Sequence, residues 1–185
     1  MRARILALAA PLLLTAAAPA PGPAFDGAFR IYDHAAVPAG ARAQVTVADH
    51  TDGVRVELLA TGLQPGRHYG AHLHTGRCGG DPADAGPHYQ HRLDPAAGPG
   101  KPSVDPAYAN PRNEVWLDLV AGADGAGRAV STQEWDFDPA RPPWSLVLHA
   151  EHTHTGPGVA GTAGARLACL TASPGSYGGA PRGLG

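Results

Sequence analysis

The chain has 185 residues and a formal net charge of −2 with histidine neutral, which is enough for one domain with a substantial core. No basic excess is present, which argues against a nucleic-acid-binding protein. The 25 glycines and 19 prolines, with only 6% aromatic residues, indicate short strands joined by turns and long loops rather than a helical bundle.

The first residues have the pattern of an export signal. Arg2 and Arg4 precede an apolar run at positions 5–18, and small residues follow. This pattern predicts a signal peptide over residues 1–24, with a cut after Ala20 as an alternative. A short membrane anchor is the other interpretation, and no other stretch is apolar enough to span a membrane. We therefore expect a secreted protein, either released or held at the cell envelope.

The remainder of the chain alternates between strand-like runs and irregular loops. Two of the runs flank a Thr-Asp-Gly turn and predict a hairpin. The loops at 76–111 and 151–163 are long for a compact domain, which is typical of functional loops. We predict one all-β domain over residues 25–172 with an antiparallel sandwich or barrel architecture, and a disordered tail at 173–185. The eight predicted strands are 28–32, 41–48, 54–58, 67–74, 114–121, 129–137, 144–149 and 165–171.

Four histidines are candidate metal ligands. His72 and His74 lie two apart at the end of a strand, so their rings share one face about 6.6–6.8 Å apart along the strand. His149 also ends a strand, and His88 lies in the first long loop. Imidazoles without nearby thiolates or carboxylates suit copper, zinc or nickel, whereas calcium prefers oxygen. Ordinary surface or core histidines are the alternative.

The two cysteines, Cys78 and Cys169, both follow the predicted signal. In an oxidising compartment an even pair is expected to form a disulfide. Two buried thiols are the alternative.

Several segments together resemble the Cu/Zn superoxide dismutase family. A Gly-x-x-Pro-Gly turn leads into a strand that carries His-x-His, and a cysteine follows closely. Later segments resemble the family's loop with the bridging histidine, the strand with the fourth copper histidine, and the C-terminal signature with its arginine and second cysteine. The resemblance runs from Gly27 to Thr171, and the segments that carry it are 62–74, Cys78, 86–89, 145–149 and 163–169.

The resemblance implies an eight-stranded antiparallel Greek-key β-sandwich or barrel with two long functional loops, which converts superoxide to oxygen and hydrogen peroxide. Arg166 would attract the superoxide anion beside the copper, and His88 would take part in catalysis. A Cys78–Cys169 disulfide would tie the first loop to the last strand. Copper would be held by His72, His74, His88 and His149.

The zinc site departs from the family pattern. Counting back from the Asp124-Gly125 turn, the zinc histidine and aspartate fall on Arg112 and Val115, which do not bind zinc. The remaining candidates for a zinc site are His91, Asp94 and Glu114, and they do not restore the family's set. We hypothesise a copper-only variant in which the second nitrogen of His88 meets a protein partner. Glu114 is the first candidate for this partner and Asp94 the second, and a solvent-facing strand position is the alternative for Glu114.

Two other functions remain open at this point. The same scaffold can serve as a non-enzymatic copper-binding or copper-handling protein, or as a structural protein without metal. His152 and His154 lie outside the family pattern, and they fit either copper capture near the site or ordinary loop residues. His68 fits a packing or hydrogen-bonding residue. A homodimer is one possible oligomeric state and a monomer another, and the sequence does not distinguish them.

Overall fold

The computed structural model describes residues 24–98 and 100–173. The predicted signal peptide and C-terminal tail therefore lie outside the described residues, except for Ala24 and Ser173. No helix among the described residues is long and apolar enough to cross a membrane.

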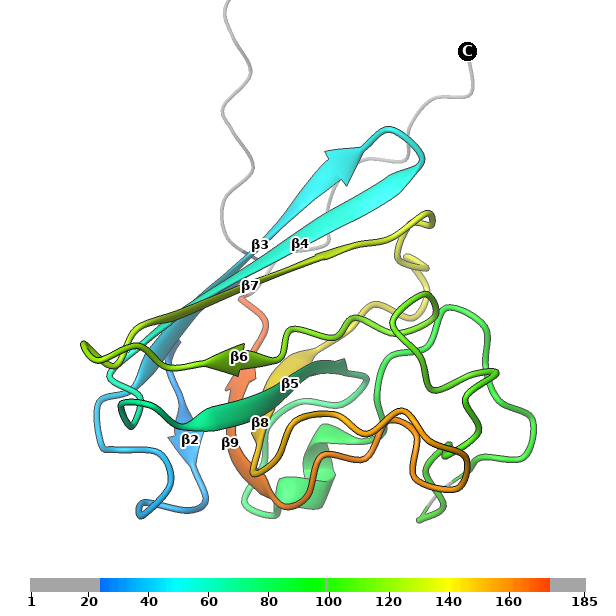
Figure 1. Cartoon of the computed structure of the whole chain (residues 1–185). Coiled ribbons are helices and arrows are strands. Elements are labelled where there is room, and N and C mark those ends of the chain that lie inside the picture. Colours follow the sequence, from blue (N-terminus) through cyan, green and yellow to red (C-terminus); the bar gives the residue numbers. More distant parts are fainter. Residues whose placement is uncertain (1–23, 99, 174–185) are drawn as a thin grey trace, which may run out of the picture.

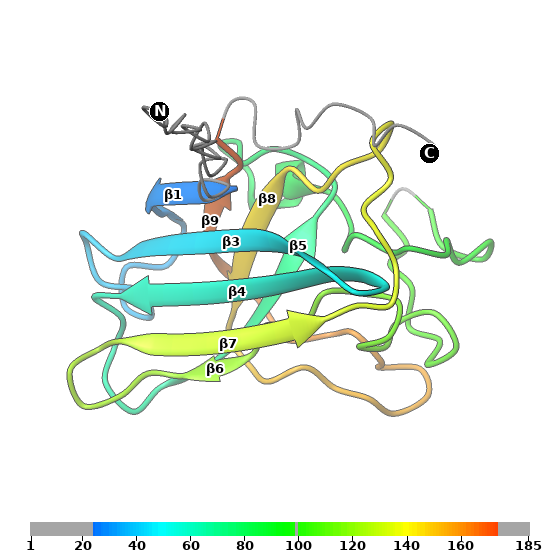
Figure 2. The same ribbon diagram turned by 90° about the horizontal axis from the view of Figure 1, so that it is seen from above.

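Two antiparallel sheets pack against each other as a sandwich, and they do not close into a barrel. Strands of the first sheet run across those of the second (Figure 2). The first sheet has the order β1-β3-β4-β7, with β1 at Phe25–Ala28, β3 at Arg42–His50, β4 at Gly53–Thr61 and β7 at Gly127–Thr132. The second sheet has the order β2-β9-β8-β5-β6, with β2 at Arg30–Ile31, β9 at Arg166–Thr171, β8 at Ser145–His149, β5 at His68–His74 and β6 at Leu119–Val120.

The chain crosses between the sheets after β1, β2, β4, β6 and β7, which is consistent with a Greek-key sandwich. The predicted hairpin is present as β3 and β4, with His50 opposite Gly53. Alternation along β4 buries Val54, Val56 and Leu58, because successive side chains of a strand point to opposite faces. The fold class expected from the sequence is thus confirmed, with a sandwich as the architecture.

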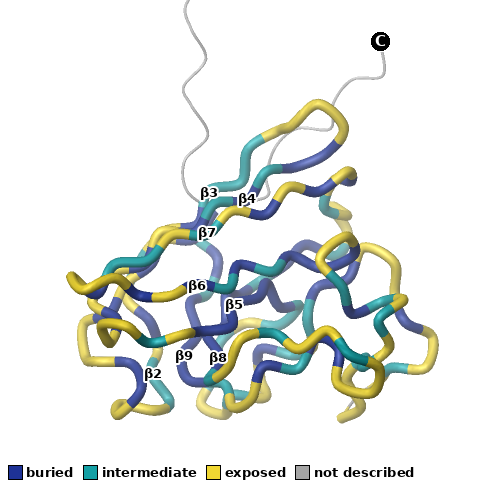
Figure 3. Tube along the Cα trace, viewed as in Figure 1, coloured by how far each residue is buried: buried dark blue, intermediate teal, exposed yellow. Residues whose placement is uncertain are grey.

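The core lies between the sheets. In Figure 3 the tube of β5, β8 and β9 in the second sheet is mostly dark blue. All five residues of β8 are buried, and so are the last six of β5. A strand buried on both faces needs cover on its outer side. In this sheet the long loops supply it, and they place the polar histidines of β5 and β8 under that cover.

Three predicted strands differ from the observed ones. The run 129–137 is shorter than expected, because β7 ends at Thr132. The run 28–32 contains the end of β1 and all of β2, which lie in different sheets; between them the Phe29 N–H donates to the carbonyl of Ala41 at 3.0 Å. The run 114–121 forms a regular strand only at β6. Before it, Glu114 pairs with the loop residue Gln90 and Trp116 pairs with His72 of β5, each by an isolated bridge. The described residues thus form nine strands, four in one sheet and five in the other, in place of the eight predicted.

The two long loops gather on one side of the molecule (Figure 1). The first contains a single 3-10 turn, η1 (Pro82–Ala85), which is capped by the side chain of Asp81. A hydrogen bond from the Gly158 N–H to the carbonyl of Val104, at 3.1 Å, joins the loops to each other. They form a cover over β5 and β8, and the candidate site lies beneath this cover.

Candidate metal centre

Strands β5 and β8 bring three histidines together. His72 and His74 share one face of β5, as their spacing predicts, and neither is exposed. His149 ends the neighbouring β8, where it lies opposite Gly70. A Cβ on Gly70 would come within 2.7 Å of the Ala163 side chain, so a glycine at this position lets the β8–β9 loop approach the strand closely.

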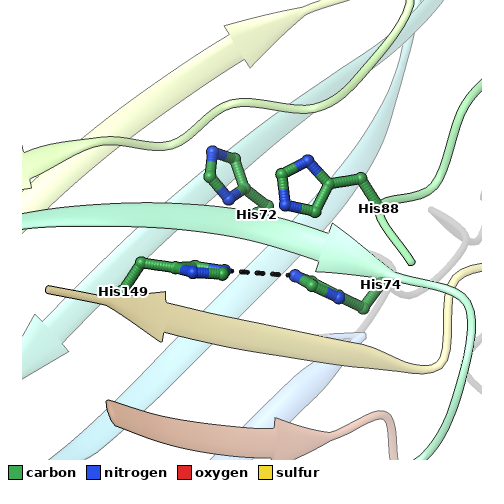
Figure 4. A group of neighbouring side chains, drawn as sticks. All are labelled: His72, His74, His88 and His149. Carbon is green, nitrogen blue, oxygen red and sulfur yellow. Dashed lines mark hydrogen bonds between the residues drawn. The ribbon is translucent and has the colours of Figure 1, made fainter. Parts of the chain in front are cut away.

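The fourth histidine comes from the first loop. His88 forms a bridge to His74, which brings its ring to 4.0 Å from that of His72, centroid to centroid. Gly86, two residues earlier, has φ of 69°, a conformation that favours glycine. Figure 4 shows the four imidazoles facing one another. One ring nitrogen from each of these four histidines lies within 4.8 Å of the others.

Each histidine has a partner for its outward-facing nitrogen, which fixes the tautomer. His74 Nδ1–H donates to the Gly86 carbonyl at 2.9 Å, and His149 Nδ1–H points to the Gly164 carbonyl at 3.5 Å. Their Nε2 atoms then carry lone pairs and face each other at 3.3 Å. Two lone pairs at this distance repel each other unless a cation or a proton lies between them, so the arrangement fits a metal ion.

A buried nitrogen without a partner supports the same conclusion. His72 Nδ1 has no hydrogen-bond partner among the described residues, and burying an unpaired polar atom is costly. The donor set is then Nδ1 of His72 and Nε2 of the other three histidines. Four neutral imidazoles without a thiolate suit copper, zinc or nickel.

The electrostatics of the cluster keep the rings of His72, His74 and His149 neutral. Burial, followed by the nearby His88, lowers the pKa of His149 to about 3. Burial and then the surrounding histidines also hold the pKa of His72 and His74 well below its ordinary value. Neutral imidazole is the form that binds a metal ion.

A buried carboxylate binds the outward nitrogen of His88. Glu114 is 2% exposed, and its Oε2 accepts from His88 Nδ1–H at 2.8 Å and from Trp116 Nε1–H at 2.7 Å. Its Oε1 accepts from Gln90 Nε2–H at 2.8 Å. The solvent-facing alternative for Glu114 is therefore wrong, because the first loop covers that face of the segment.

The outward nitrogen of His72 has a different partner. The Thr153 hydroxyl donates to Asp118 Oδ1 at 2.7 Å, which leaves its oxygen to accept from His72 Nε2–H at 2.7 Å. Asp118 also accepts from the backbone N–H of Ala71 and of Thr153. Sequence reasoning missed Thr153 and Asp118. The alternation of the segment 114–119 carried a signal, since its odd positions are apolar and Glu114, Trp116 and Asp118 share the other face.

Arg166 opens β9 next to the histidine cluster, in register with His149. Its guanidinium donates to the carbonyl of Pro82 at 2.8 Å and to that of Gly86 at 2.6 Å. The Gly86 carbonyl also accepts from His74, so one backbone group links the guanidinium to a cluster histidine. The side chain is only partly buried, which leaves a fixed positive charge beside the cluster.

The disulfide between Cys78 and Cys169 is present, with Cα atoms 5.7 Å apart. It joins the first loop to β9 three residues after Arg166. The Cys78 N–H also donates to the Thr171 hydroxyl at 3.1 Å. One covalent bond and one hydrogen bond thus join the first loop to β9. The same loop supplies the two carbonyls that accept hydrogen bonds from Arg166.

Comparison with known proteins bears on the fold. The Cu/Zn superoxide dismutase from Brucella abortus superposes with a TM-score of 0.53 at 20% identity, over 80% of this chain and 99% of that one. The chain has the superoxide dismutase fold. A double mutant of a superoxide dismutase-like protein from Bacillus subtilis gives 0.50 at 18% identity, over 71% and 87% of the two chains.

The clock protein EA4 superposes with a TM-score of 0.51 at 21% identity, over 85% of this chain and 98% of that one. No protein-family profile matches the sequence, and no curated protein matches it. At these identities the likeness extends to the fold, and the chemistry has to be argued from the residues of the site.

The candidates for a zinc site within this superoxide dismutase fold do not come together. His91 stacks on Trp135 with ring centroids 4.9 Å apart. Asp94 accepts from the Ser103 hydroxyl and the Ala96 N–H, while Glu114 faces His88. Among the described residues, the four-histidine cluster is the one group whose ligand atoms converge in this way. Asp94, the second candidate partner of His88, therefore has a different role.

The positions aligned with the family's zinc ligands also have other roles. Val115 is buried in the core at 1% exposure. The backbone carbonyl of Arg112 accepts from Trp135 Nε1–H at 2.7 Å. One face of this segment thus packs into the core through Val115, and the other face carries Glu114, which accepts the hydrogen bond from His88.

Proposed function

We propose that this chain is an extracytoplasmic superoxide dismutase whose copper ion is held by His72, His74, His88 and His149. The observation that carries the proposal is the convergence of four imidazole nitrogens within 4.8 Å, with an arginine fixed beside them. Copper, when bound, supplies the one-electron redox chemistry by which one superoxide is oxidised to oxygen and another is reduced to hydrogen peroxide.

The chain's own residues prepare the ligands and the substrate approach. Thr153 and Glu114 hold the protons of the outward nitrogens of His72 and His88, so that the inward nitrogens keep their lone pairs. Arg166 adds a local positive field to a chain with a formal net charge of −2. This field raises the local concentration of an anionic substrate and orients it.

Copper alone is our proposal for the metal content, without zinc. In this account Glu114 takes the place of a second metal as the partner of His88. Gln90 and Trp116 hold the Glu114 carboxylate from both of its oxygens, which gives it one orientation. Its charge strengthens the His88 hydrogen bond and makes the imidazole a better electron donor to a metal.

The location outside the cytoplasm follows from the predicted signal peptide, and the disulfide is compatible with it. Secretion can be tested by expressing the full chain in a bacterium and fractionating the cells. We expect the mature protein to begin near Phe25 and to appear outside the cytoplasmic fraction. Retention of residues 1–24 in the folded product would contradict this part of the proposal.

The test of the enzyme is superoxide removal by the copper-loaded chain. We expect rapid removal, which His149→Ala or His88→Ala abolishes. If Arg166→Glu loses activity and keeps its full copper content, the result supports a role for Arg166 in attracting the substrate. An inactive wild-type chain with one tightly bound copper would refute the enzyme.

That same result would support a second candidate, a non-enzymatic copper-binding or copper-handling protein. The occurrence of this fold in a clock protein favours keeping this candidate. The two candidates share the four ligands and differ in turnover alone. A direct kinetic measurement with pulse-generated superoxide therefore separates them.

A further inference from the structure

Two exposed histidines meet at the surface outside the four-histidine centre. His68 opens β5, and His152 lies in the loop after β8. Their ring centroids are 4.9 Å apart in an edge-to-face arrangement. The His152 side chain is 47% exposed. Strand β5 and this loop thus bring together two imidazoles whose residues are 84 positions apart in the sequence.

A carboxylate lies beside this pair. Asp118 Oδ2 is 3.5 Å from His152 Nδ1. Hydrogen bonds from the backbone N–H of Ala71 and Thr153 and from the Thr153 hydroxyl already fix the orientation of Asp118. Its side chain is 19% exposed, so an ion arriving from solvent can reach it. This third group is therefore preorganised, whereas the two rings are free to adjust.

We propose that His68, His152 and Asp118 form a second site, which binds a transition-metal ion at the surface. Two imidazoles and one carboxylate suit Zn²⁺, Ni²⁺ or Cu²⁺, and they are a poor match for Ca²⁺ or Mg²⁺. Bonds of about 2.0–2.2 Å require the rings to turn toward the carboxylate. Both rings lie at the surface, so this rotation displaces no core side chain.

The site is adjacent to the buried centre through hydrogen bonds. Thr153 lies between Asp118 and His72, at 2.7 Å from each partner atom. An ion bound at the surface would thus be connected to His72, a candidate ligand of the buried centre, through the Asp118 carboxylate and the Thr153 hydroxyl. The second site goes beyond the proposed dismutase function, and its binding does not depend on that function.

The nearby His154 provides a matched control. It lies in the same loop, its side chain is 50% exposed, and its Nε2 pairs with Glu151 at 3.0 Å, away from Asp118. His152→Ala and His154→Ala therefore remove the same chemical group from neighbouring exposed positions. Circular dichroism on each variant checks that the fold is kept.

The test is a calorimetric titration of the full chain with Ni²⁺. We expect His68→Ala and His152→Ala each to weaken the surface binding step by at least about tenfold, because each removes a ligand. His154→Ala should leave that step at the wild-type affinity. Equal affinities of His152→Ala and His154→Ala would overturn the proposal, and so would loss of all Ni²⁺ binding in His149→Ala. Copper content is measured on the same samples, so failure of the buried copper centre gives a different result from failure of the surface site.

Discussion

The role assigned to Glu114 gives the most specific prediction. Glu114→Gln keeps the size of the side chain and removes its charge. The wild-type carboxylate accepts from His88 and Trp116 at one oxygen and from Gln90 at the other. An amide has one acceptor oxygen, so its NH₂ group must face at least one of these donors.

The magnitude follows from this count. With the amide oxygen toward His88 and Trp116, the bond from Gln90 is lost and a buried donor remains unsatisfied. A hydrogen bond to a charged group contributes about 1.5–3 kcal/mol. We therefore expect the free energy of unfolding of the metal-free chain to fall by about 2–3 kcal/mol. Copper affinity should fall about 10- to 100-fold, the usual cost of disturbing the partner of a ligand histidine.

The assays are denaturant unfolding of the metal-free chain and competition for copper against a chelator of known affinity. Glu151→Gln is the control, because Glu151 is 59% exposed and pairs with an exposed histidine. A surface pair of this kind should contribute less than about 1 kcal/mol. Wild-type copper affinity in Glu114→Gln, or equal effects of the two substitutions, would refute the reasoning.

Three further predictions follow from pH, charge and the disulfide. The pKa of His149 is about 3 in the fold and about 6.5 in an unfolded chain; the unfolded state therefore takes up the proton first. The free energy of unfolding of the metal-free chain should fall as the pH is lowered from about 6.5 toward 3, by up to about 1.4 kcal/mol per pH unit for this group. Urea denaturation at a series of pH values measures it, and a free energy of unfolding that does not change over this range would contradict the prediction. Arg166→Glu should keep copper and slow superoxide removal about tenfold or more, and salt should slow the wild type by screening; an unchanged rate, or lost copper, would mean that this role is wrong. Replacing both Cys78 and Cys169 with serine should lower the free energy of unfolding by about 2–5 kcal/mol, and a reductant should then have no further effect on thermal unfolding.

The histidine cluster was predictable because its members lie at strand ends or in recognisable segments. His72 and His74 share a strand face by period alone, and the observed geometry brings His88 and His149 to the same point. The residue types then limit the metal to those that prefer nitrogen. The tautomers, by contrast, depend on backbone carbonyls such as that of Gly86, which a sequence pattern does not locate.

The partners of the ligands were harder to predict, because they depend on the paths of long loops. Thr153 is one hydroxyl in an irregular segment, and only the fold brings it to His72. Glu114 was a candidate, but alternation alone cannot distinguish a face covered by a loop from one facing water. The alternation of the same segment correctly indicated one apolar face, since Val115 and Leu117 are buried, but the strand predicted there forms only at β6.

Metal content tests the central claim most directly. The full chain should be loaded from a mixture of copper and zinc salts, freed of loosely bound ions by a weak chelator, and analysed for both metals. The account predicts one copper and no zinc in each chain, and loss of that copper in His74→Ala. A chain that retains one zinc, with or without copper, or a wild-type copper content in His74→Ala, would contradict it.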